Sequence, residues 1–238
     1  MKFNSACYTA TGTRANNEDS VFCSERKDGF LAIVADGLGG HADGELASSM
    51  AISTIRDILP DSPPNEDALI DAIRQASKEI FAAQNPQHPM HTTVTALWLG
   101  STAGIAAHVG DSRVYQFRNG EIIYQSLDHS VAQMAVLVGE LPPDELRHSR
   151  DRNRLIRVLG TSDVPLVDSQ ALSVQPGDRF LLCSDGFWEN VLETDMLETL
   201  TYTATADDWL TSMRTIAENA ANTSQDNHTA IALIVDET

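Results

Sequence analysis

The 238-residue chain is long enough for one large domain or two small ones, and its hydrophobic content of 42% is sufficient for a substantial core. Its net charge of −18, from 16 basic and 34 acidic residues, argues against binding to nucleic acid or to anionic membrane surfaces. No apolar run is as long as a membrane span, and the N-terminal residues lack a secretory signal pattern, so we expect a cytoplasmic protein.

The cysteines exclude one class of chemistry. They are three in number and far apart in the sequence, so neither a disulfide framework nor a paired-cysteine metal site is indicated. A cysteine-dependent phosphatase needs an arginine six positions after its nucleophile, to close a phosphate-binding loop around the thiolate. The positions concerned hold Thr13, Gly29 and Glu189.

The N-terminal part of the chain combines strands with two helices. Apolar stretches predict strands over residues 5–11, 20–23 and 30–35. Apolar residues then recur at helical spacing over residues 45–59, and again after a potential helix cap at Asn65. Proline ends the first helix at Pro60 and the second at Asn85-Pro86.

The remaining chain is richer in strands. Strands are expected over residues 92–99, 104–109, 113–118 and 122–125, with a hairpin at Asn119-Gly120. A short helix to about residue 138 precedes a polar excursion over residues 139–163, which we expect at the surface. Strands over 166–174, 178–183 and 228–235 and helices over 195–200 and 206–221 follow. This segregation of helices from largely antiparallel strands indicates an α+β fold, and two face-to-face sheets with helices outside would fit it.

Residues 34–48 carry the first indication of function. A buried strand is expected to end at Asp36, and Gly37-Leu-Gly-Gly40 follows before a helix. A carboxylate beside glycines, whose backbone carbonyls can approach a ligand, is typical of a site for a hard cation. A simple strand-to-helix turn with Asp36 as a turn residue explains this stretch equally well. Both interpretations stay open on these residues alone.

Acidic residues recur where apolar strands begin or end. Asp36, Asp111 and Asp185 follow strands, whereas Asp226 and the pair Glu18-Asp19 precede them. In an antiparallel arrangement such ends can share one rim, where the carboxylates would bind Mg²⁺ or Mn²⁺ rather than zinc. Each aspartate taken singly is also a common turn residue.

Other catalytic patterns are missing from the sequence. The seven histidines show no metal-binding spacing, and most are expected to be surface or structural residues. Neither a GxxxxGK phosphate loop nor a GxSxG nucleophile turn occurs.

Eight segments, taken together, resemble the metal-dependent protein Ser/Thr phosphatases of type 2C in their compact bacterial form. They occur in the family's order across nearly the whole chain. The segments are Arg14-Ala-Asn-Asn-Glu-Asp19, Val34-Ala-Asp-Gly-Leu-Gly-Gly40 with Gly44-Glu45 and Ala47-Ser48, Thr92-Thr93, Val109-Gly-Asp-Ser-Arg113, Leu127-Asp-His129, Leu155-Ile-Arg-Val-Leu-Gly160, Leu182-Cys-Ser-Asp-Gly186 and Asp226-Asn227.

The resemblance implies a four-layer α/β/β/α sandwich, in which two mainly antiparallel sheets are flanked by helices, with a flap over residues 139–163. The whole chain, residues 1–238, would form one phosphatase domain. Two to three divalent cations, Mn or Mg, are implied as cofactors. By position, Asp36 would bridge two ions and the Gly37 carbonyl would bind one of them, while Asp185 and Asp226 would bind the other.

The resemblance also assigns the neighbouring residues. Asp19, and Glu18 beside it, would act on the ions directly or through bound water. Asp111 with Asp185 would hold a third, weaker ion. Arg14 would grip the phosphate oxygens with a planar fork that lysine cannot copy.

The implied reaction is hydrolysis of phosphoserine or phosphothreonine by direct attack of a metal-bridging hydroxide. The chain departs from many eukaryotic relatives at Leu38, where they carry a histidine proposed as general acid. His41 lies nearby in sequence without an assigned role. His91 also stands where a glycine is usual, and we draw no consequence from it.

As partners, the resemblance implies phosphorylated proteins and a cognate Ser/Thr kinase, with no nucleic acid and no membrane, and we expect a monomer. Two other classes stay open. The first is a pseudophosphatase that binds phosphoproteins without turnover, against which the intact set of Arg14, Asp36, Asp185 and Asp226 speaks. The second is a regulatory phosphatase with one dedicated partner, whose usual sensory domains would not fit in this chain.

Overall fold

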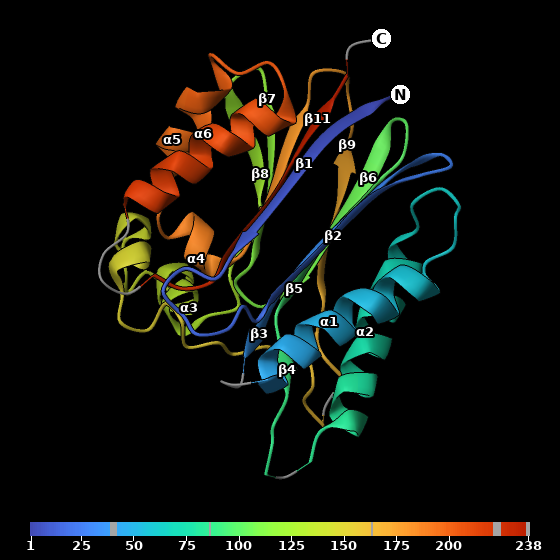
Figure 1. The fold of residues 1–238 in the computed structure, drawn as a ribbon, viewed down its shortest axis with the longest axis vertical. Helices are drawn as coiled ribbons and strands as arrows, with labels where there is room; N and C mark the ends of the chain where they lie inside the picture. Colours follow the sequence, from blue (N-terminus) through green and yellow to red (C-terminus); the bar gives the residue numbers. More distant parts are fainter. Residues whose placement is uncertain (39–41, 86, 163, 221–224, 237–238) are drawn as a thin grey trace.

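Two antiparallel sheets lie face to face at the centre of the protein (Figure 1). The computed structural model describes residues 1–38, 42–85, 87–162, 164–220 and 225–236. In the first sheet the strand order is β1 (Phe3–Ala10), β11 (His228–Val235), β10 (Arg179–Cys183), β7 (Arg113–Arg118) and β8 (Glu121–Gln125). In the second it is β2 (Asp19–Arg26), β3 (Gly29–Leu38), β5 (Val94–Leu99), β6 (Ala103–Val109) and β9 (Asp168–Ser173), with β4 (His91–Thr92) paired to the end of β3.

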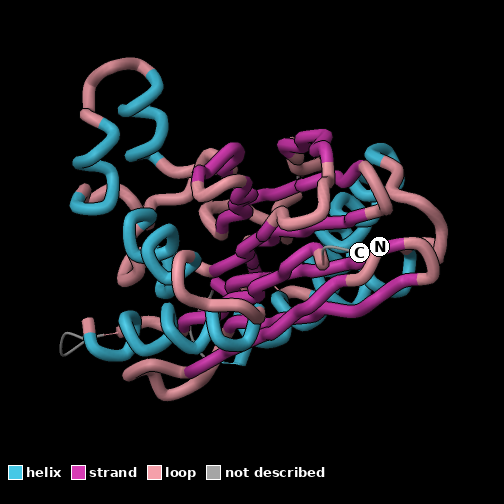
Figure 2. The backbone as a smooth tube through the Cα atoms, turned by 90° about the horizontal axis from the view of Figure 1, so that it is seen from above, coloured by secondary structure: helices cyan, strands magenta, loops and turns pink. Residues whose placement is uncertain are grey.

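Helices cover the outer face of each sheet. The helices α1 (Ala42–Ile58) and α2 (Glu66–Ala83) pack on the second sheet, and α5 (Glu193–Leu200) and α6 (Ala206–Asn219) pack on the first. Seen at right angles, the strands remain in the middle with helices around them (Figure 2), and the start of β1 pairs with the end of β11. The expected four-layer α+β sandwich is therefore confirmed.

The period of two along each strand produces these layers. On β3, Phe30 and Val34 point between the sheets, whereas Leu31 and Ile33 point toward α1 and α2. On β11, Ile231 and its alternate neighbours lie between the sheets in the same way. Each central strand is buried on both faces, so it reads as a continuous apolar run.

Local turn chemistry agrees with the sequence at two places. The Asn65 side chain accepts a hydrogen bond from the Ala68 amide at 2.9 Å and caps α2 as expected. Asn119 and Gly120 have φ values of 53° and 78°, which two-residue hairpin turns of this kind require.

The strand after residue 30 was predicted to end at Asp36, and this prediction is wrong. Strand β3 continues to Leu38, because Gly37 and Leu38 pair with Thr92 and His91 of β4. The interpretation of Asp36 as a turn residue is therefore wrong as well. Gly37 is required there, since a Cβ atom would lie 2.1 Å from the Gly44 carbonyl oxygen.

The segment from residue 139 to 162 is not wholly irregular. It follows α3 (Val131–Leu137) and contains a 3-10 helix, η1 (Pro143–His148). A one-turn helix, α4 (Asp185–Trp188), was not predicted and begins directly after β10. Residues Gly39, Gly40, His41 and Asp163, which the sequence singled out, lie outside the described residues. Among the described helices none is long and apolar enough to cross a membrane.

Replacing Ile231 by alanine tests the buried space between the sheets. Ile231 is fully buried, so we expect the free energy of unfolding to fall by about 2–5 kcal/mol. Ile123→Ala, on the edge strand β8, is the control, because Ile123 is 44% exposed and its loss should cost about 0.5 kcal/mol. Urea unfolding followed by circular dichroism measures both, and equal losses would contradict this layering.

Candidate active site

One cavity of about 530 Å³ opens where the strand ends of both sheets meet. It gathers side chains from segments that are distant in sequence. Its lining residues are Arg14, Ala15, Asn16, Glu18, Asp36, Gly37, Leu38, Asp111, Asn153, Leu155, Asp185, Asp226 and Asn227. The structure thus brings Arg14, Gly37 and five of the predicted carboxylate residues to one place, while Asp19 lies behind them.

Strand register places two of the carboxylate residues side by side. Asp19 and Asp36 are directly opposite each other in the β2–β3 pair. The backbone of Asp36 is fixed on its other side by Thr93, whose hydroxyl accepts from the Asp36 amide at 3.0 Å and whose amide donates to the Asp36 carbonyl at 2.8 Å. The Thr92 hydroxyl donates to the same carbonyl at 2.8 Å. The threonine pair therefore holds Asp36 in position.

Ser184 connects the two sheets at the floor of the site. Its hydroxyl donates to Asp19 Oδ2 at 2.8 Å and accepts from the Thr229 amide at 3.0 Å. Asp185 follows it as the first residue of α4. Next comes Gly186, where a Cβ atom would lie 2.2 Å from the Asn227 carbonyl oxygen, so only glycine permits this approach.

Asn227 orders the loop that carries Glu18. Its side-chain oxygen accepts from the Glu18 amide at 2.8 Å, and its side-chain nitrogen donates to the carbonyls of Thr11 and Asn16 at 2.9 Å each. The sequence singled out Asn227 only as part of a motif. Only the structure reveals that Asn227 joins the loops before β2 and β11.

The carboxylates are buried and resist ionisation. Burial first, and then the charges of Asp19, Asp185 and Asp111, raises the pKa of Asp36 well above its usual value. Burial and then Asp185 do the same for the pKa of Asp111. Each carboxylate is therefore destabilised in its charged form by its neighbours.

The same causes act on the other two buried acids. Burial, followed by the charges of Glu189 and Asp226, raises the pKa of Asp185 to about 7. Burial raises the pKa of Asp19 to about 6, and Asp19 Oδ1 is buried without a hydrogen-bond partner among the described residues. Buried polar atoms are rarely left unpaired, so this oxygen has an unused capacity to bind.

Arg14 lies at the mouth of the cavity. Among the described residues that line it, Arg14 alone is cationic, and its side chain is 57% exposed. Its Nη2 donates to Asp226 Oδ2 at 2.6 Å, and this bond and the charge of Asp226 raise the pKa of Arg14. One exposed cation cannot balance five carboxylates.

The donor set fits hard divalent cations. The side chains that face the cavity offer carboxylate and amide oxygens, and among the described lining residues there is no thiol or imidazole. Oxygen ligands suit Mg²⁺ and Mn²⁺. Cations would neutralise the clustered charges and could use the free Asp19 oxygen, so the residues present fit a metal centre.

A second group with metal-ligand types, His108, His129 and Asp168, does not line this cavity. His129 Nδ1 accepts from the Gly110 amide at 3.2 Å, and its Nε2 lies 3.2 Å from both Asp168 Oδ2 and Arg157 Nη1. Arg157 Nη1 lies 2.7 Å from Asp168 Oδ1 and already supplies a positive charge. We regard this group as structural.

Two residues on the cavity wall were given no site role from the sequence: Asn153 was not singled out, and Leu155 was singled out only as part of a motif. Asn153 and Leu155 come from the segment expected to form a flap, and both line the cavity. They carry no distinctive spacing relative to the acids. Only the folded segment reveals that they face the site.

Comparisons with known proteins identify the family. The sequence pattern described as protein phosphatase 2C matches residues 9–230. The chain is 38% identical over 195 residues to the serine/threonine protein phosphatase PstP of Mycobacterium tuberculosis, which covers 79% of this chain but 36% of that protein, so the chain spans about a third of this relative's length. It is 33% identical over 217 residues to the serine/threonine phosphatase stp of Listeria monocytogenes, covering 87% of this chain and 82% of that one.

A solved structure of the catalytic domain of the serine/threonine protein phosphatase PstP, in complex with two manganese ions, superimposes with a TM-score of 0.84. It is 31% identical and covers 99% of each chain. This chain belongs to the protein phosphatase 2C family.

The raised pKa of Asp185 predicts a specific dependence of stability on pH. A pKa raised from 3.8 to about 7 stabilises the metal-free fold below the lower value, and this stabilisation is lost as the pH rises through the higher one. Asparagine does not ionise. In chelator at pH 8 we therefore expect the free energy of unfolding of Asp185→Asn to exceed that of wild type by roughly 2–4 kcal/mol, since one pKa unit corresponds to about 1.4 kcal/mol.

Urea unfolding in EDTA at pH 5 and pH 8 measures this difference. The advantage of the variant should be less than half as large at pH 5 as at pH 8. A difference that does not change with pH would contradict the assignment of a strained carboxylate at this position.

Proposed function

We propose that this chain is a metal-dependent protein serine/threonine phosphatase. The supporting observation is the convergence of buried carboxylates, with raised pKa values, in one cavity beside a single arginine. Membership of the protein phosphatase 2C family supports the same activity. Likeness to a catalytic domain crystallised with two manganese ions supports Mn or Mg as the cofactor.

Each acidic residue receives a role in this proposal. Asp36 and the Gly37 carbonyl would hold one cation, and Asp36, Asp185 and Asp226 would hold a second. Asp36 lies at the centre of the acidic cluster, since its pKa is raised by acidic neighbours from three separate segments. When bound, the cations lower the pKa of a water molecule and neutralise charge on the phosphoryl group.

Further acidic residues support this centre from its edges. Asp19 and Glu18 would act directly or through water, and the unpaired Asp19 oxygen is consistent with that role. Asp111 with Asp185 would hold a third, weaker cation. The charge of Asp185 raises the pKa of Asp111, and both residues line the cavity, which supports a shared site.

Arg14 would bind the substrate phosphate. Its guanidinium is at the cavity mouth, where it can turn from Asp226 toward phosphate oxygens once cations neutralise Asp226. Leu38 lines the cavity and cannot transfer a proton, so we assign no side chain as general acid.

The proposal extends to the biological setting. We infer that the substrates are phosphoproteins produced by a bacterial Ser/Thr kinase, that the chain acts as a monomer and that it does so in the cytoplasm. The strongly acidic composition supports the lack of nucleic-acid and membrane partners.

The main alternative is a pseudophosphatase, which would bind phosphoproteins without hydrolysing them. Turnover of p-nitrophenyl phosphate and of a phosphothreonine peptide with Mn²⁺ decides between the two. Metal-dependent turnover that EDTA abolishes is expected. Folded protein that binds the peptide without releasing phosphate would establish the alternative.

Asp36→Asn should lower kcat by about 100-fold or more, which corresponds to about 2.7 kcal/mol of lost transition-state stabilisation. The substitution keeps the size of the side chain but removes its charge. Asp43→Asn, in the first turn of α1 and outside the cavity lining, is the control. Steady-state kinetics at saturating Mn²⁺ measures both, and near-normal turnover by Asp36→Asn would reject the metal assignment.

Arg14→Ala should lower kcat/KM for the phosphopeptide by about tenfold or more, because charge-assisted contacts contribute about 1.5–3 kcal/mol. The Mn²⁺ affinity should stay within twofold. Arg14→Lys should restore little, since lysine lacks the planar fork. Arg56→Ala on α1, where Arg56 pairs with Asp57, is the control. Unchanged phosphopeptide kinetics in Arg14→Ala would remove Arg14 from the mechanism.

A further inference from the structure

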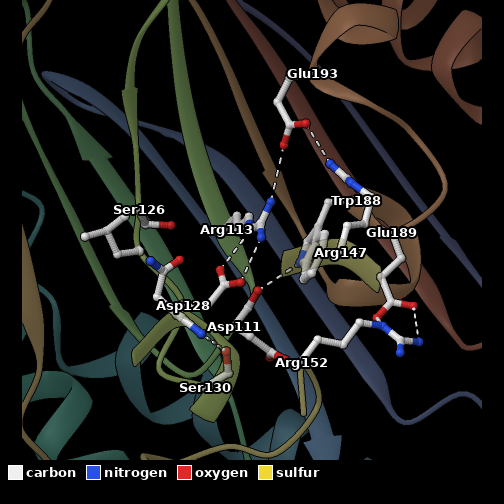
Figure 3. Close-up of polar contacts among 12 residues, drawn as sticks. Asp111, Arg113, Ser126, Asp128, Ser130, Arg147, Arg152, Trp188, Glu189 and Glu193 are labelled. Carbon is white, nitrogen blue, oxygen red and sulfur yellow. Dashed lines mark hydrogen bonds and ion pairs between the residues drawn. The ribbon is translucent and has the colours of Figure 1, made fainter. Parts of the chain in front are cut away.

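The backbone of Asp111 is held by a buried tryptophan. The indole N–H of Trp188 donates to the Asp111 carbonyl at 2.9 Å, and the exposed fractions of the two residues are 1% and 3% (Figure 3). Trp188 is the last residue of α4, which begins at Asp185. One indole therefore connects the helix of one cavity carboxylate to the backbone of another.

Arg113 fixes the orientation of this indole. Its Cζ lies 3.5 Å from the centroid of the Trp188 ring, within the range of a cation–π contact. Its Nε and Nη2 each donate to Asp128 at 2.8 Å, which forms a buried two-point ion pair. Because its Nε and Nη2 are both bound to Asp128, the guanidinium cannot rotate away from the ring.

Glu193 joins a second arginine to the same ring. Its Oε1 accepts from Arg113 Nη1 at 3.3 Å, and its Oε2 accepts from Arg147 Nη2 at 2.7 Å (Figure 3). Arg147 belongs to η1, within the segment that also sends Asn153 to the cavity. Its Cζ lies 5.2 Å from the Trp188 ring centroid. The 3-10 helix is thus docked onto the residue that holds Asp111.

The charges in this network balance among themselves. Two arginines, Arg113 and Arg147, are matched by Asp128 and Glu193. No net positive charge remains to neutralise Asp111 in place of a cation. The effect of the network on Asp111 is therefore one of position.

We propose that Trp188 and Arg147 are positioning residues for Asp111, so that docking of η1 on the indole sets the affinity of the cation that Asp111 binds. The inference rests on the proposed function, which makes Asp111 a cation ligand. It goes beyond that function by linking the segment over residues 139–162 to one ion through named contacts.

A linkage of this kind works in both directions. If docked η1 strengthens cation binding at Asp111, then the bound cation must stabilise docked η1 by the same factor. Protection of the η1 backbone is therefore a second readout that does not depend on turnover.

The first test measures Mn²⁺ binding to purified protein, with free Mn²⁺ counted by electron paramagnetic resonance. Trp188→Phe keeps an aromatic ring beneath Arg113 but removes the indole N–H, and Arg147→Met removes the guanidinium from η1. We expect either change to weaken the weakest Mn²⁺ site about tenfold, at the lower end of the effect of residues that orient metal ligands.

Two substitutions serve as matched controls. Trp209 is also buried and donates its indole N–H to a carbonyl, that of Met196 at 3.2 Å, so Trp209→Phe makes the same chemical change. Arg214 also pairs with a glutamate, Glu218 at 2.7 Å, and lies over a ring, so Arg214→Met removes the same kinds of contact at a more exposed position. Both controls should keep every Mn²⁺ affinity within twofold.

The second test is hydrogen exchange of residues 143–148 with and without saturating Mn²⁺. Exchange in the wild type should slow about tenfold on adding Mn²⁺, and Trp188→Phe should abolish this protection. Arg147→Met tests the link independently if Trp188→Phe fails to fold, since Arg147 belongs to η1 and not to a central strand.

The outcomes separate this inference from the function on which it rests. Wild-type affinities in both Trp188→Phe and Arg147→Met would overturn it, as would an equal loss in the two controls. Turnover and Mn²⁺ binding by the wild type would leave the proposed function standing in either case. Wild-type protein that binds no Mn²⁺ would overturn the proposed function and the inference together.

Discussion

Repulsion between buried carboxylates is the constraint on which the rest of the structure depends. Asp19 and Asp36 are opposite each other in a strand pair, and Asp185 reaches the same cavity from the other sheet. Bringing these groups together costs free energy, because each carboxylate loses hydration and gains a like-charged neighbour. Holding them together needs a rigid frame and a positive partner.

The frame comes from the two sheets. Ser184 links Asp19 to β11 through Thr229, and the threonine pair at residues 92–93 fixes Asp36. Close backbone contacts at Gly37 and Gly186 leave no space for a Cβ atom. The positive partner in this account is a group of divalent cations. Arg14 alone is insufficient, and it remains at the mouth, where a phosphate would enter.

Much of the fold could be predicted from the sequence. Strands buried on both faces leave continuous apolar runs, and helix caps and hairpin turns prefer particular residues, such as Asn65 and Asn119-Gly120. The end of β3 was misjudged since Gly37 reads as a breaker, and only its pairing with the distant Thr92 makes it part of a strand. The one-turn helix α4 was missed because four residues are too few to show a helical period.

The acidic residues of the site were found because each lies next to the end of an apolar run, although Asp36 proved to lie within β3. The residues that hold them were less accessible to such reasoning. Trp188, Glu193 and Asn153 look like ordinary core or surface positions in the sequence. Their importance comes from contacts across long sequence separations, such as the bond from Trp188 to Asp111.

The central claim is that cations replace protons at these carboxylates. Titration calorimetry with Mn²⁺ at pH 6.5, in buffers of different ionisation enthalpy, measures ion stoichiometry and proton release together. We predict at least two bound ions and net proton release, because burial raises the pKa of Asp185 to about 7. Weak binding of one ion without proton release would contradict the account.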